Sequence, residues 1–278
     1  MNIIKIAAFA DGDTGGNPAG VVLNNKMPNT EDMQRIAAEI GFSETVFAEM
    51  QSDQNRWRVR YFSPESEVPF CGHATIALGA ELAKNYGDRQ YQLILNEADI
   101  TVTGNKDKEG YTAALQSPPT HYQLLNTQQI DATLALFAYK QDQLSDRLSA
   151  ARIHAGANHY VFALKSMRDL ASMTYDLDEG RRFMRNNSLV TIMFVVVESD
   201  ELFHARNAFA SGGVLEDPAT GAAAAAFSAY LRDSAWTNKN KLTIIQGADM
   251  GSRSIIKAEY SNQPGSSVRI SGATRVLD

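Results

Sequence analysis

Hydrophobic and polar residues in the first 120 positions predict short strands around two helices. Residues 30–41 carry acidic side chains early, apolar residues at helical spacing and Gly41 at the end, and residues 73–87 have a similar apolar face. Elsewhere apolar and β-branched residues alternate with polar ones, as in half-buried strands. These strand-like runs cover 3–9, 19–23, 45–50, 56–63, 91–98, 99–105 and 111–118.

The pattern restarts after a Pro-bearing segment, residues 117–126. An alanine-rich helix is predicted over 219–233, with other helices over 131–148 and 178–187. The strand-like runs of this half cover 151–164 (two strands around a Gly turn), 191–198, 202–210, 241–248, 254–260 and 267–277. The recurrence of strands, a helix with a glycine-flanked start and further strands indicates two similarly built halves.

This arrangement predicts an α+β fold in two halves, residues 1–120 and 121–278, with the final strand possibly crossing back. Each half is expected to be a curved, mostly antiparallel sheet around one helix. A parallel α/β sheet is the alternative, but each parallel pair needs a long crossover, and the strands cluster between only a few helices.

Composition narrows the function. The 278 residues carry a formal charge of -6, with scattered Lys and Arg, which argues against a nucleic-acid partner. Cys71 is the single cysteine and leaves no internal disulfide. The longest apolar run, 191–197, is too short to span a membrane, and no signal peptide is visible at the start, so a cytoplasmic location is expected.

Three glycine-bearing turns stand out as candidate binding sites: Gly15–Gly20, Pro69–Thr75 and Glu216–Ala223. Two of them open predicted helices, whose free backbone N–H groups attract anions. Facing a common cleft, they would clamp the carboxylate of a small anionic substrate. These residues could equally be ordinary caps and turns. The first turn lacks the Gly-Lys-Ser/Thr ending of a phosphate-binding loop.

Three side chains near these turns are candidates for proton transfer. Glu44 lies between a helix and an apolar strand, and a carboxylate shielded from water there holds a proton more readily. His73 lies just inside the second helix, and Asp217 precedes the alanine-rich helix. The alternatives are a solvent-facing turn glutamate, a structural histidine and an N-capping aspartate.

Cys71 beside His73 allows a different chemistry, because a helix N-terminus lowers the pKa of a thiol. A thiolate hydrolase or transferase is therefore a second hypothesis, although the sequence identifies no orienting third residue. The histidines at 73, 154, 159 and 204 do not have metal-ligand spacing, so no metal is expected.

Four segments together identify a family resemblance. GGNPAGVV, GFSETVF, RYFSPESEVPFCGHAT and EDPATGAAAA, in this order, resemble the PhzF-like family of phenazine-biosynthesis isomerases, related in fold to diaminopimelate epimerase. The resemblance covers essentially the whole chain. It implies two pseudo-symmetric halves, each a barrel-like sheet around a central helix, with the active site between them. It also implies cofactor-independent isomerisation by proton transfer, and a homodimer is plausible.

The resemblance assigns roles residue by residue. It places the family's acid/base on Glu44 and other proton-transfer residues on His73 and Asp217. The positions it implies for substrate contact are Asn17, Gly72, Thr75, Asn158, Gly221 and Ala222.

Two departures limit what the resemblance implies. Ala222 stands where the phenazine enzyme has serine, which removes a possible substrate hydrogen bond, and the lone Cys71 excludes the two-cysteine mechanism of the epimerases. We therefore expect an isomerase of an unspecified small carboxylate. A non-catalytic small-molecule binding protein remains the alternative, beside the Cys71/His73 hydrolase or transferase.

Overall fold

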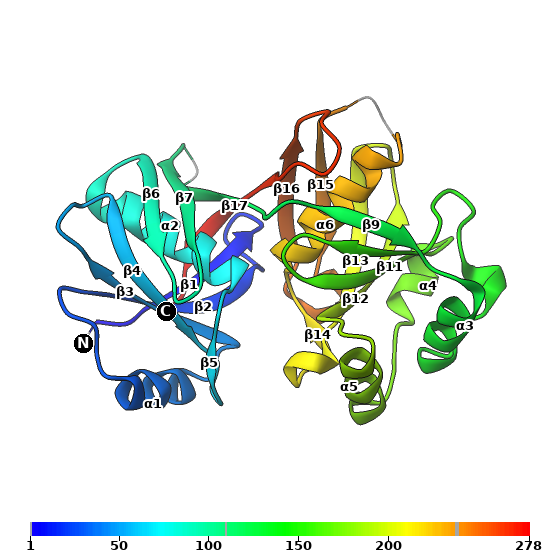
Figure 1. The fold of residues 1–278 in the computed structure, drawn as a ribbon, viewed down its shortest axis with the longest axis horizontal. Coiled ribbons are helices and arrows are strands. Elements are labelled where there is room, and N and C mark those ends of the chain that lie inside the picture. Colours follow the sequence, from blue (N-terminus) through cyan, green and yellow to red (C-terminus); the bar gives the residue numbers. More distant parts are fainter. Residues whose placement is uncertain (1, 109, 237–238) are drawn as a thin grey trace. The chain divides into compact units, whose positions relative to one another are not determined.

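The computed structural model describes residues 2–108, 110–236 and 239–278, and the chain divides into two compact units (Figure 1). Unit 1 comprises Met1–Gln116 and Ser271–Asp278, and unit 2 comprises Ser117–Ile270. The division falls slightly before the boundary predicted at residue 120. The last strand, β17 (Val268–Val276), begins in unit 2 and ends in unit 1.

Unit 1 is a closed barrel. Its other strands are β1 (Ile4–Ala10), β2 (Asn17–Asn24), β3 (Glu44–Met50), β4 (Arg56–Phe62), β5 (Glu67–Val68), β6 (Arg89–Ile94), β7 (Asp99–Lys106) and β8 (Tyr111–Gln116). Pairing runs β1–β2–β3–β4–β6–β7–β8–β17 and returns to β1, which closes eight strands. The short β5 adds to β4. Closure removes the exposed sheet edges.

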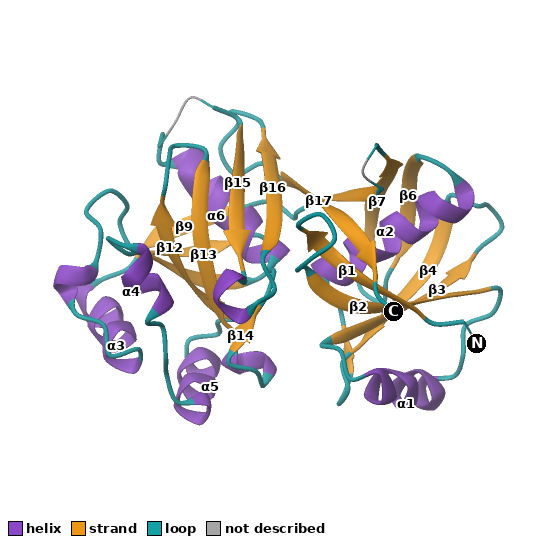
Figure 2. Ribbon diagram, turned by 180° about the vertical axis from the view of Figure 1, so that it is seen from behind, coloured by secondary structure: helices purple, strands orange, loops and turns teal. Residues whose placement is uncertain are grey.

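Two helices connect the parallel strand pairs of unit 1. Helix α1 (Thr30–Ile40) links β2 to β3, and α2 (Gly72–Tyr86) follows β5 and leads to β6, which pairs in parallel with β4. Helix α2 is buried from His73 to Ala83 and contacts β1, β2, β7 and β8, so it fills the barrel (Figure 2).

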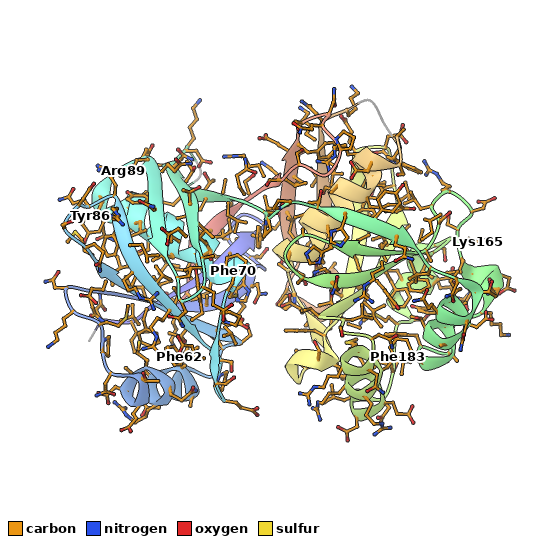
Figure 3. The ribbon with its side chains drawn as sticks, in the orientation of Figure 1. Phe62, Phe70, Tyr86, Arg89, Lys165 and Phe183 are labelled. Carbon is orange, nitrogen blue, oxygen red and sulfur yellow. The ribbon has the colours of Figure 1, made fainter. Side chains whose placement is uncertain are left out.

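Glycine allows α2 to lie close to the barrel wall. A Cβ built on Gly104 of β7 would lie 2.1 Å from the Gly79 carbonyl oxygen of α2, so only glycine fits there. Outside the barrel, α1 packs on an apolar cluster that includes Phe62, labelled in Figure 3. The cluster consists of Val22, Met33, Ile36, Ala37, Phe47 and Phe62.

Unit 2 repeats the strand order of unit 1. Its strands are β9 (His121–Leu124), β10 (Ala151–His154), β11 (Asn158–Ala163), β12 (Thr191–Val197), β13 (Leu202–Ala208), β14 (Glu216–Asp217), β15 (Lys241–Gln246) and β16 (Ser254–Tyr260). The parallel pairs are β11 with β12 and β13 with β15, and β14 adds to β13 as β5 adds to β4. Its helices are α3 (Thr127–Leu136), α4 (Met167–Ala171), α5 (Leu177–Asn186) and the buried α6 (Gly221–Asp233).

The α+β class and the mostly antiparallel sheets are confirmed, but several details of the prediction were wrong. The helix predicted over 131–148 is α3, which begins earlier because Asn126 and Gln129 form a capping box. It ends at Leu136, and Ala138 has a φ of 54°, which continues no helix.

Smaller corrections concern element boundaries. Asn29, the residue before the predicted helix, caps α1 by accepting from the Asp32 N–H. Strand β2 starts at Asn17, two residues before the predicted run, and β9 lies within the segment predicted as a boundary. Helix α4 was not predicted. In the parts of the chain that the structure describes, no helix is long and apolar enough to cross a membrane.

Candidate active site

Glu44 lies at the first position of β3, opposite Ala19 of β2. Gly41 ends α1 in the left-handed conformation, with a φ of 71°, which turns the chain from the helix toward the strand. The Glu44 side chain is only 14% exposed. The carboxylate is thus held by a strand of the barrel and largely shielded from water.

The start of α2 brings Cys71, Gly72 and His73 to the same region of unit 1. Cys71 is the extended residue before the helix, and His73 is in its first turn with a side chain 7% exposed. The Thr75 hydroxyl donates to the Cys71 carbonyl oxygen (2.7 Å) and lies 2.7 Å from the Tyr61 hydroxyl. Burial raises the pKa of Tyr61 well above its usual range, so its hydroxyl stays protonated and donates to Thr75.

The His73 imidazole contacts three other side chains. Its Nε2 lies 3.4 Å from Glu44 Oε2 and 3.4 Å from Ser43 Oγ, and its Nδ1 lies 3.3 Å from Cys71 Sγ. A carboxylate, an imidazole and a thiol therefore meet within one barrel. Such a group can take up, hold and release a proton.

Asp217 lies in unit 2, in β14 just before α6. It lies opposite Asn207 of β13 and is 7% exposed. The Thr220 hydroxyl donates to Asp217 Oδ2 (2.5 Å), and Gln246 Nε2 donates to the Asp217 carbonyl oxygen (2.7 Å). Both the side chain and the backbone of Asp217 are therefore fixed by hydrogen bonds.

A buried polar network continues from Asp217 through the strands of unit 2. Asn207 Nδ2 donates to Gln246 Oε1 (3.1 Å), and the Thr191 hydroxyl donates to Asn207 Oδ1 (3.0 Å). His159 Nδ1 lies 2.8 Å from Thr191 Oγ1. Burial lowers the pKa of His159 to about 3, so the ring is neutral, and since Thr191 already donates to Asn207, Nδ1 carries the proton.

The starts of α2 and α6 differ from those of the other helices. A side chain of Asn29, Asn126, Ser166 or Asp176 caps α1, α3, α4 and α5. The residues before α2 and α6, Cys71 and Thr220, make no side-chain capping bond. The side chain of the preceding residue therefore does not cap these two helices, which favours an anionic ligand at each.

Residues 6–277 match the family model for phenazine biosynthesis-like proteins, PhzC-PhzF. The chain belongs to this family. The match covers all the residues of the two sites described above.

Several curated relatives of this chain are named isomerases. An uncharacterized isomerase of Clostridium acetobutylicum is 27% identical over 99% of this chain and 96% of its own length. The trans-2,3-dihydro-3-hydroxyanthranilate isomerase of Pseudomonas aeruginosa is 28% identical over 97% of this chain and 94% of its own length. A Bacillus anthracis phenazine biosynthesis protein of the PhzF family has a similar fold, with a TM-score of 0.88 at 19% identity, covering 99% of this chain and 96% of that one.

Two of the residues that the PhzF resemblance suggests for substrate contact form hydrogen bonds within the protein. Thr75 is fully buried, and its hydroxyl bonds to the Cys71 carbonyl oxygen and the Tyr61 hydroxyl. Asn158 Oδ1 accepts a hydrogen bond from His154 Nδ1 (2.9 Å), and Asn158 Nδ2 donates to the Ser188 carbonyl oxygen (3.3 Å). Its amide therefore stabilises the β10–β11 turn.

The remaining predicted positions lie at the starts of β2, α2 and α6. Asn17 is buried at the first position of β2. Gly72 has no atom within 4 Å of the place where a Cβ would be, so the backbone there borders open space. Gly221 is buried and Ala222 is half-buried at the start of α6.

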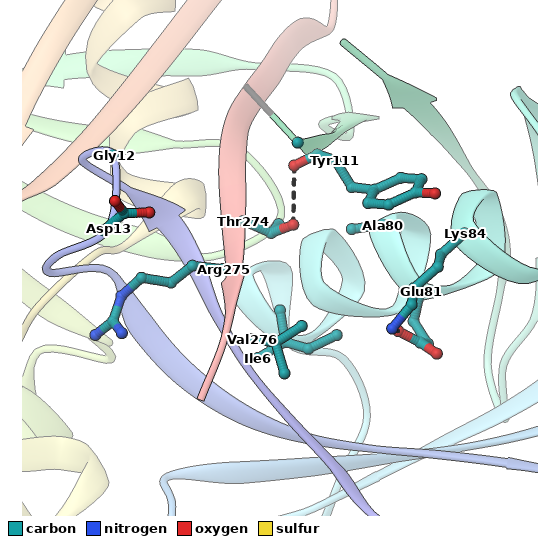
Figure 4. Close-up of a pocket in the computed structure, with 11 residues that line it drawn as sticks. Ile6, Gly12, Asp13, Ala80, Glu81, Lys84, Tyr111, Thr274, Arg275 and Val276 are labelled. Carbon is teal, nitrogen blue, oxygen red and sulfur yellow. Dashed lines mark hydrogen bonds and ion pairs between the residues drawn. The ribbon is translucent and has the colours of Figure 1, made fainter. Parts of the chain in front are cut away.

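A surface pocket of about 300 Å³ in unit 1 lies elsewhere and shares no residue with these sites (Figure 4). It lies along α2 and β17, where Thr274 donates to the Tyr111 carbonyl oxygen (2.9 Å). The Asp13 and Arg275 side chains border one side of it. The buried Glu81 also lines it, 3.8 Å from Lys84 Nζ.

Sequence reasoning missed several polar residues of these sites. Ser43 and Thr220 are adjacent to recognised motifs, and their position next to Glu44 and Gly221 was the available signal. Asn207, Gln246 and His159 lie inside strand-like runs, where single polar residues give no indication that they meet.

Proposed function

We propose that this PhzF-family protein is an isomerase that moves a proton on a small carboxylate-bearing metabolite, with Glu44 as general acid and base. The observation that carries the proposal is the Glu44–His73 pair, 3.4 Å apart with side chains only 14% and 7% exposed. A shielded carboxylate beside an imidazole is suited to exchange a proton with carbon. The isomerase names of the curated relatives support the reaction class.

In the proposed reaction Glu44 removes a proton from a carbon next to an activating group. The electron pair of that C–H bond moves into the adjoining unsaturated system, and the Glu44 carboxyl returns the proton to another carbon of the same molecule. His73 Nε2 holds the Glu44 carboxylate in position, and Ser43 Oγ, 3.4 Å from the same nitrogen, helps to orient the ring. The atoms balance without a redox cofactor.

The substrate carboxylate is assigned to the backbone at the start of α2. This helix lacks a side-chain cap, and Gly72 leaves open space beside its first turn. Donors fixed in advance stabilise negative charge without reorganisation. Asp217, held by Thr220 and Gln246, is proposed as a further proton-transfer residue of unit 2.

The name of one relative suggests a class of substrate. The Pseudomonas aeruginosa enzyme is named for trans-2,3-dihydro-3-hydroxyanthranilate, a small carboxylate. Ala222 offers no hydroxyl at the start of α6. We therefore propose a related unsaturated acid, recognised with one hydrogen bond fewer.

Proton NMR of the reaction mixture tests this proposal. The protein is incubated with trans-2,3-dihydro-3-hydroxyanthranilate and with a panel of small β,γ-unsaturated acids. We expect at least one compound to convert to an isomer of equal mass in which a C–H bond has moved. If every compound remains unchanged, the proposed substrate class is wrong.

One contact favours a second candidate function. Cys71 Sγ lies 3.3 Å from His73 Nδ1, the arrangement of a thiol activated by an adjacent base. A Cys71/His73 hydrolase or transferase would form a covalent thioester intermediate. Cys71→Ala decides between the two: loss of all turnover favours the thiol mechanism, and persistence of isomerisation excludes it.

A further inference from the structure

The pocket along α2 and β17 contains a buried carboxylate that the proposed reaction does not use (Figure 4). Glu81 of α2 lines this pocket with a side chain only 3% exposed. Its Oε1 accepts a hydrogen bond from Asn85 Nδ2 (2.7 Å), whereas its Oε2 faces Lys84 Nζ at 3.8 Å, which is longer than a hydrogen bond. A buried carboxylate gains stability from each donor it finds. Glu81 Oε2 can therefore accept a hydrogen bond from a molecule in the pocket.

Lys84 brings the opposite charge to the same part of the pocket. It lies three residues further along α2, and its side chain is 46% exposed. Water therefore screens its attraction to Glu81, and its ammonium keeps donors for another acceptor. The other charged lining residues, Asp13 and Arg275, lie on the opposite side of β17 in Figure 4. The α2 side of the pocket thus presents one anion and one cation, loosely paired.

The spacing of this pair suits a zwitterion. Standard bond lengths place the ammonium nitrogen of an α-amino acid roughly 3 Å from its nearer carboxylate oxygen, close to the 3.8 Å between Glu81 Oε2 and Lys84 Nζ. Laid antiparallel to the protein pair, such a ligand directs its ammonium at Glu81 and its carboxylate at Lys84, which forms two charge-assisted hydrogen bonds. A ligand with one charge forms only one of them.

The rest of the pocket favours a small hydrocarbon side chain. Ile6 and Ala80 line it and are each 2% exposed, and Val276 lines it with 58% of its surface exposed. Apolar atoms of a ligand would cover part of the Val276 surface. The Thr274 hydroxyl already donates to the Tyr111 carbonyl oxygen. With a volume of about 300 Å³, the pocket is at the small end of ligand-binding cavities.

We propose that this pocket binds a small aliphatic α-amino acid as its zwitterion. The ammonium binds Glu81, the carboxylate binds Lys84, and the side chain packs against Ile6 and Val276. No covalent bond forms or breaks. The pocket shares no residue with the Glu44 site, so the proposal does not depend on the isomerase reaction.

Titration calorimetry of the intact protein with L-valine tests the ligand class. We expect one saturable site for L-valine. Isobutylamine and isovalerate keep the hydrocarbon part but carry only the amine or only the carboxylate, and each should bind at least about tenfold more weakly because one charge-assisted hydrogen bond is lost. The absence of L-valine binding, or equal affinity for either single-charge compound, would overturn the proposal.

Two substitutions test the protein side of the pair. Lys84→Met and Glu81→Gln should each weaken L-valine binding at least about tenfold. Lys84 is half-exposed, so its replacement should leave the protein folded even if Glu81→Gln does not. The matched control is Glu179→Gln, which alters an exposed glutamate 3.9 Å from Arg182 at the same spacing on α5 and should leave the affinity unchanged. Wild-type affinity in Lys84→Met would contradict the assignment.

Methyl NMR of the intact protein locates the bound amino acid. L-Valine should shift the methyl signals of Ile6 and Val276, which line the pocket, and leave that of Val46, two residues from Glu44, in place. Shifts at Val46 without shifts at Ile6 and Val276 would place the amino acid near Glu44 and overturn the proposal. Neither calorimetry nor NMR involves turnover, so their failure leaves the isomerase proposal standing.

Discussion

The starts of α2 and α6 occupy equivalent places in the two units but carry different chemistry. Each follows a two-residue strand that pairs with a long strand, and in each case an arginine and a glutamate join the two strands. Arg60 lies 2.6 Å from Glu67 in unit 1, and Arg206 lies 2.5 Å from Glu216 in unit 2. The same scaffold therefore presents two uncapped helix starts.

The difference lies in the side chains beside each start. At α2, ionisable groups meet: Glu44, Cys71 and His73 lie within 4.8 Å. At α6, Asp217 is the ionisable group, and amide and hydroxyl groups of Gln246 and Thr220 fix it. One barrel design can therefore build a titratable cluster or a rigid polar network, depending on which residues the strands supply. We expect substitutions at α6 to affect folding most and those at α2 to affect chemistry most.

The largest effect on folding is expected from Gly247→Ala. Gly247 has a φ of 75°, and a Cβ there would lie 2.6 Å from the Ser252 carbonyl oxygen and 2.7 Å from that of Pro218, just before α6. Strain and overlap should lower the free energy of unfolding by about 3 kcal/mol or more in urea denaturation. Gly72→Ala is the control, since its Cβ meets open space at α2 and should change stability by less than about 1 kcal/mol. Equal losses of stability in the two variants would contradict the expectation that substitutions at α6 affect folding most.

Removing a member of the α6 network should have the next largest effect. Asn207→Leu leaves the Thr191 hydroxyl without its acceptor and removes one of the two donors to Gln246 Oε1, which keeps the Thr220 N–H. Urea denaturation should show a loss of about 2–3 kcal/mol, the penalty for a buried donor left unpaired and a buried hydrogen bond lost. Cys71→Ala at α2 should cost only about 1 kcal/mol. A smaller loss for Asn207→Leu than for Cys71→Ala would show that the network does not stabilise unit 2.

His159 should make folding sensitive to acid. The unfolded imidazole takes up a proton as the pH falls below about 6.5, whereas burial keeps the folded ring neutral down to a pKa of about 3. Unfolding is therefore increasingly favoured through this window, by about 2 kcal/mol at pH 5 relative to pH 7. His159→Gln should reduce the measured loss by about that amount. The exposed His121→Gln serves as control, and an unchanged loss in His159→Gln would contradict the assignment.

The smallest effect is expected from Ser43→Ala at the α2 cluster. Ser43 Oγ is 3.4 Å from His73 Nε2, a long contact that contributes modestly to ring orientation. Turnover of the identified acid should fall a few-fold, with stability unchanged within about 0.5 kcal/mol. A loss comparable to that of removing Glu44 would mean that Ser43 takes part in proton transfer.

The sequence was sufficient to predict two similarly built halves, because strand alternation and the two glycine-flanked helix starts are local patterns. It also identified Glu44, His73 and Asp217 as candidates through motifs that are continuous in the chain. Only the family resemblance implied barrel-like sheets, because the local patterns do not show closure, which depends on β17 pairing with β1 across the whole length of the chain. Nor could the sequence show that Thr75 bonds within the core, since burial of a helix face depends on which strands surround it.

The sequence also could not predict that Gln246 and His159 belong to the buried polar network of unit 2. Each is a single polar residue in a strand-like run, and such residues usually face solvent. Only the parallel pairing of β13 with β15 and of β11 with β12 brings their side chains to Asn207 and Thr191. Long-range pairing of this kind leaves no local trace in the sequence.

The most direct test of the account is the turnover of Glu44→Gln on the acid that the wild-type protein isomerises. The substitution keeps the size of the side chain but removes the exchangeable carboxyl proton. We expect kcat to fall by roughly 10²–10⁴-fold while Kd for the acid changes less than about threefold, and Glu49→Gln on the same strand to retain turnover. A Glu44→Gln protein that isomerises the acid at the wild-type rate would contradict the central claim.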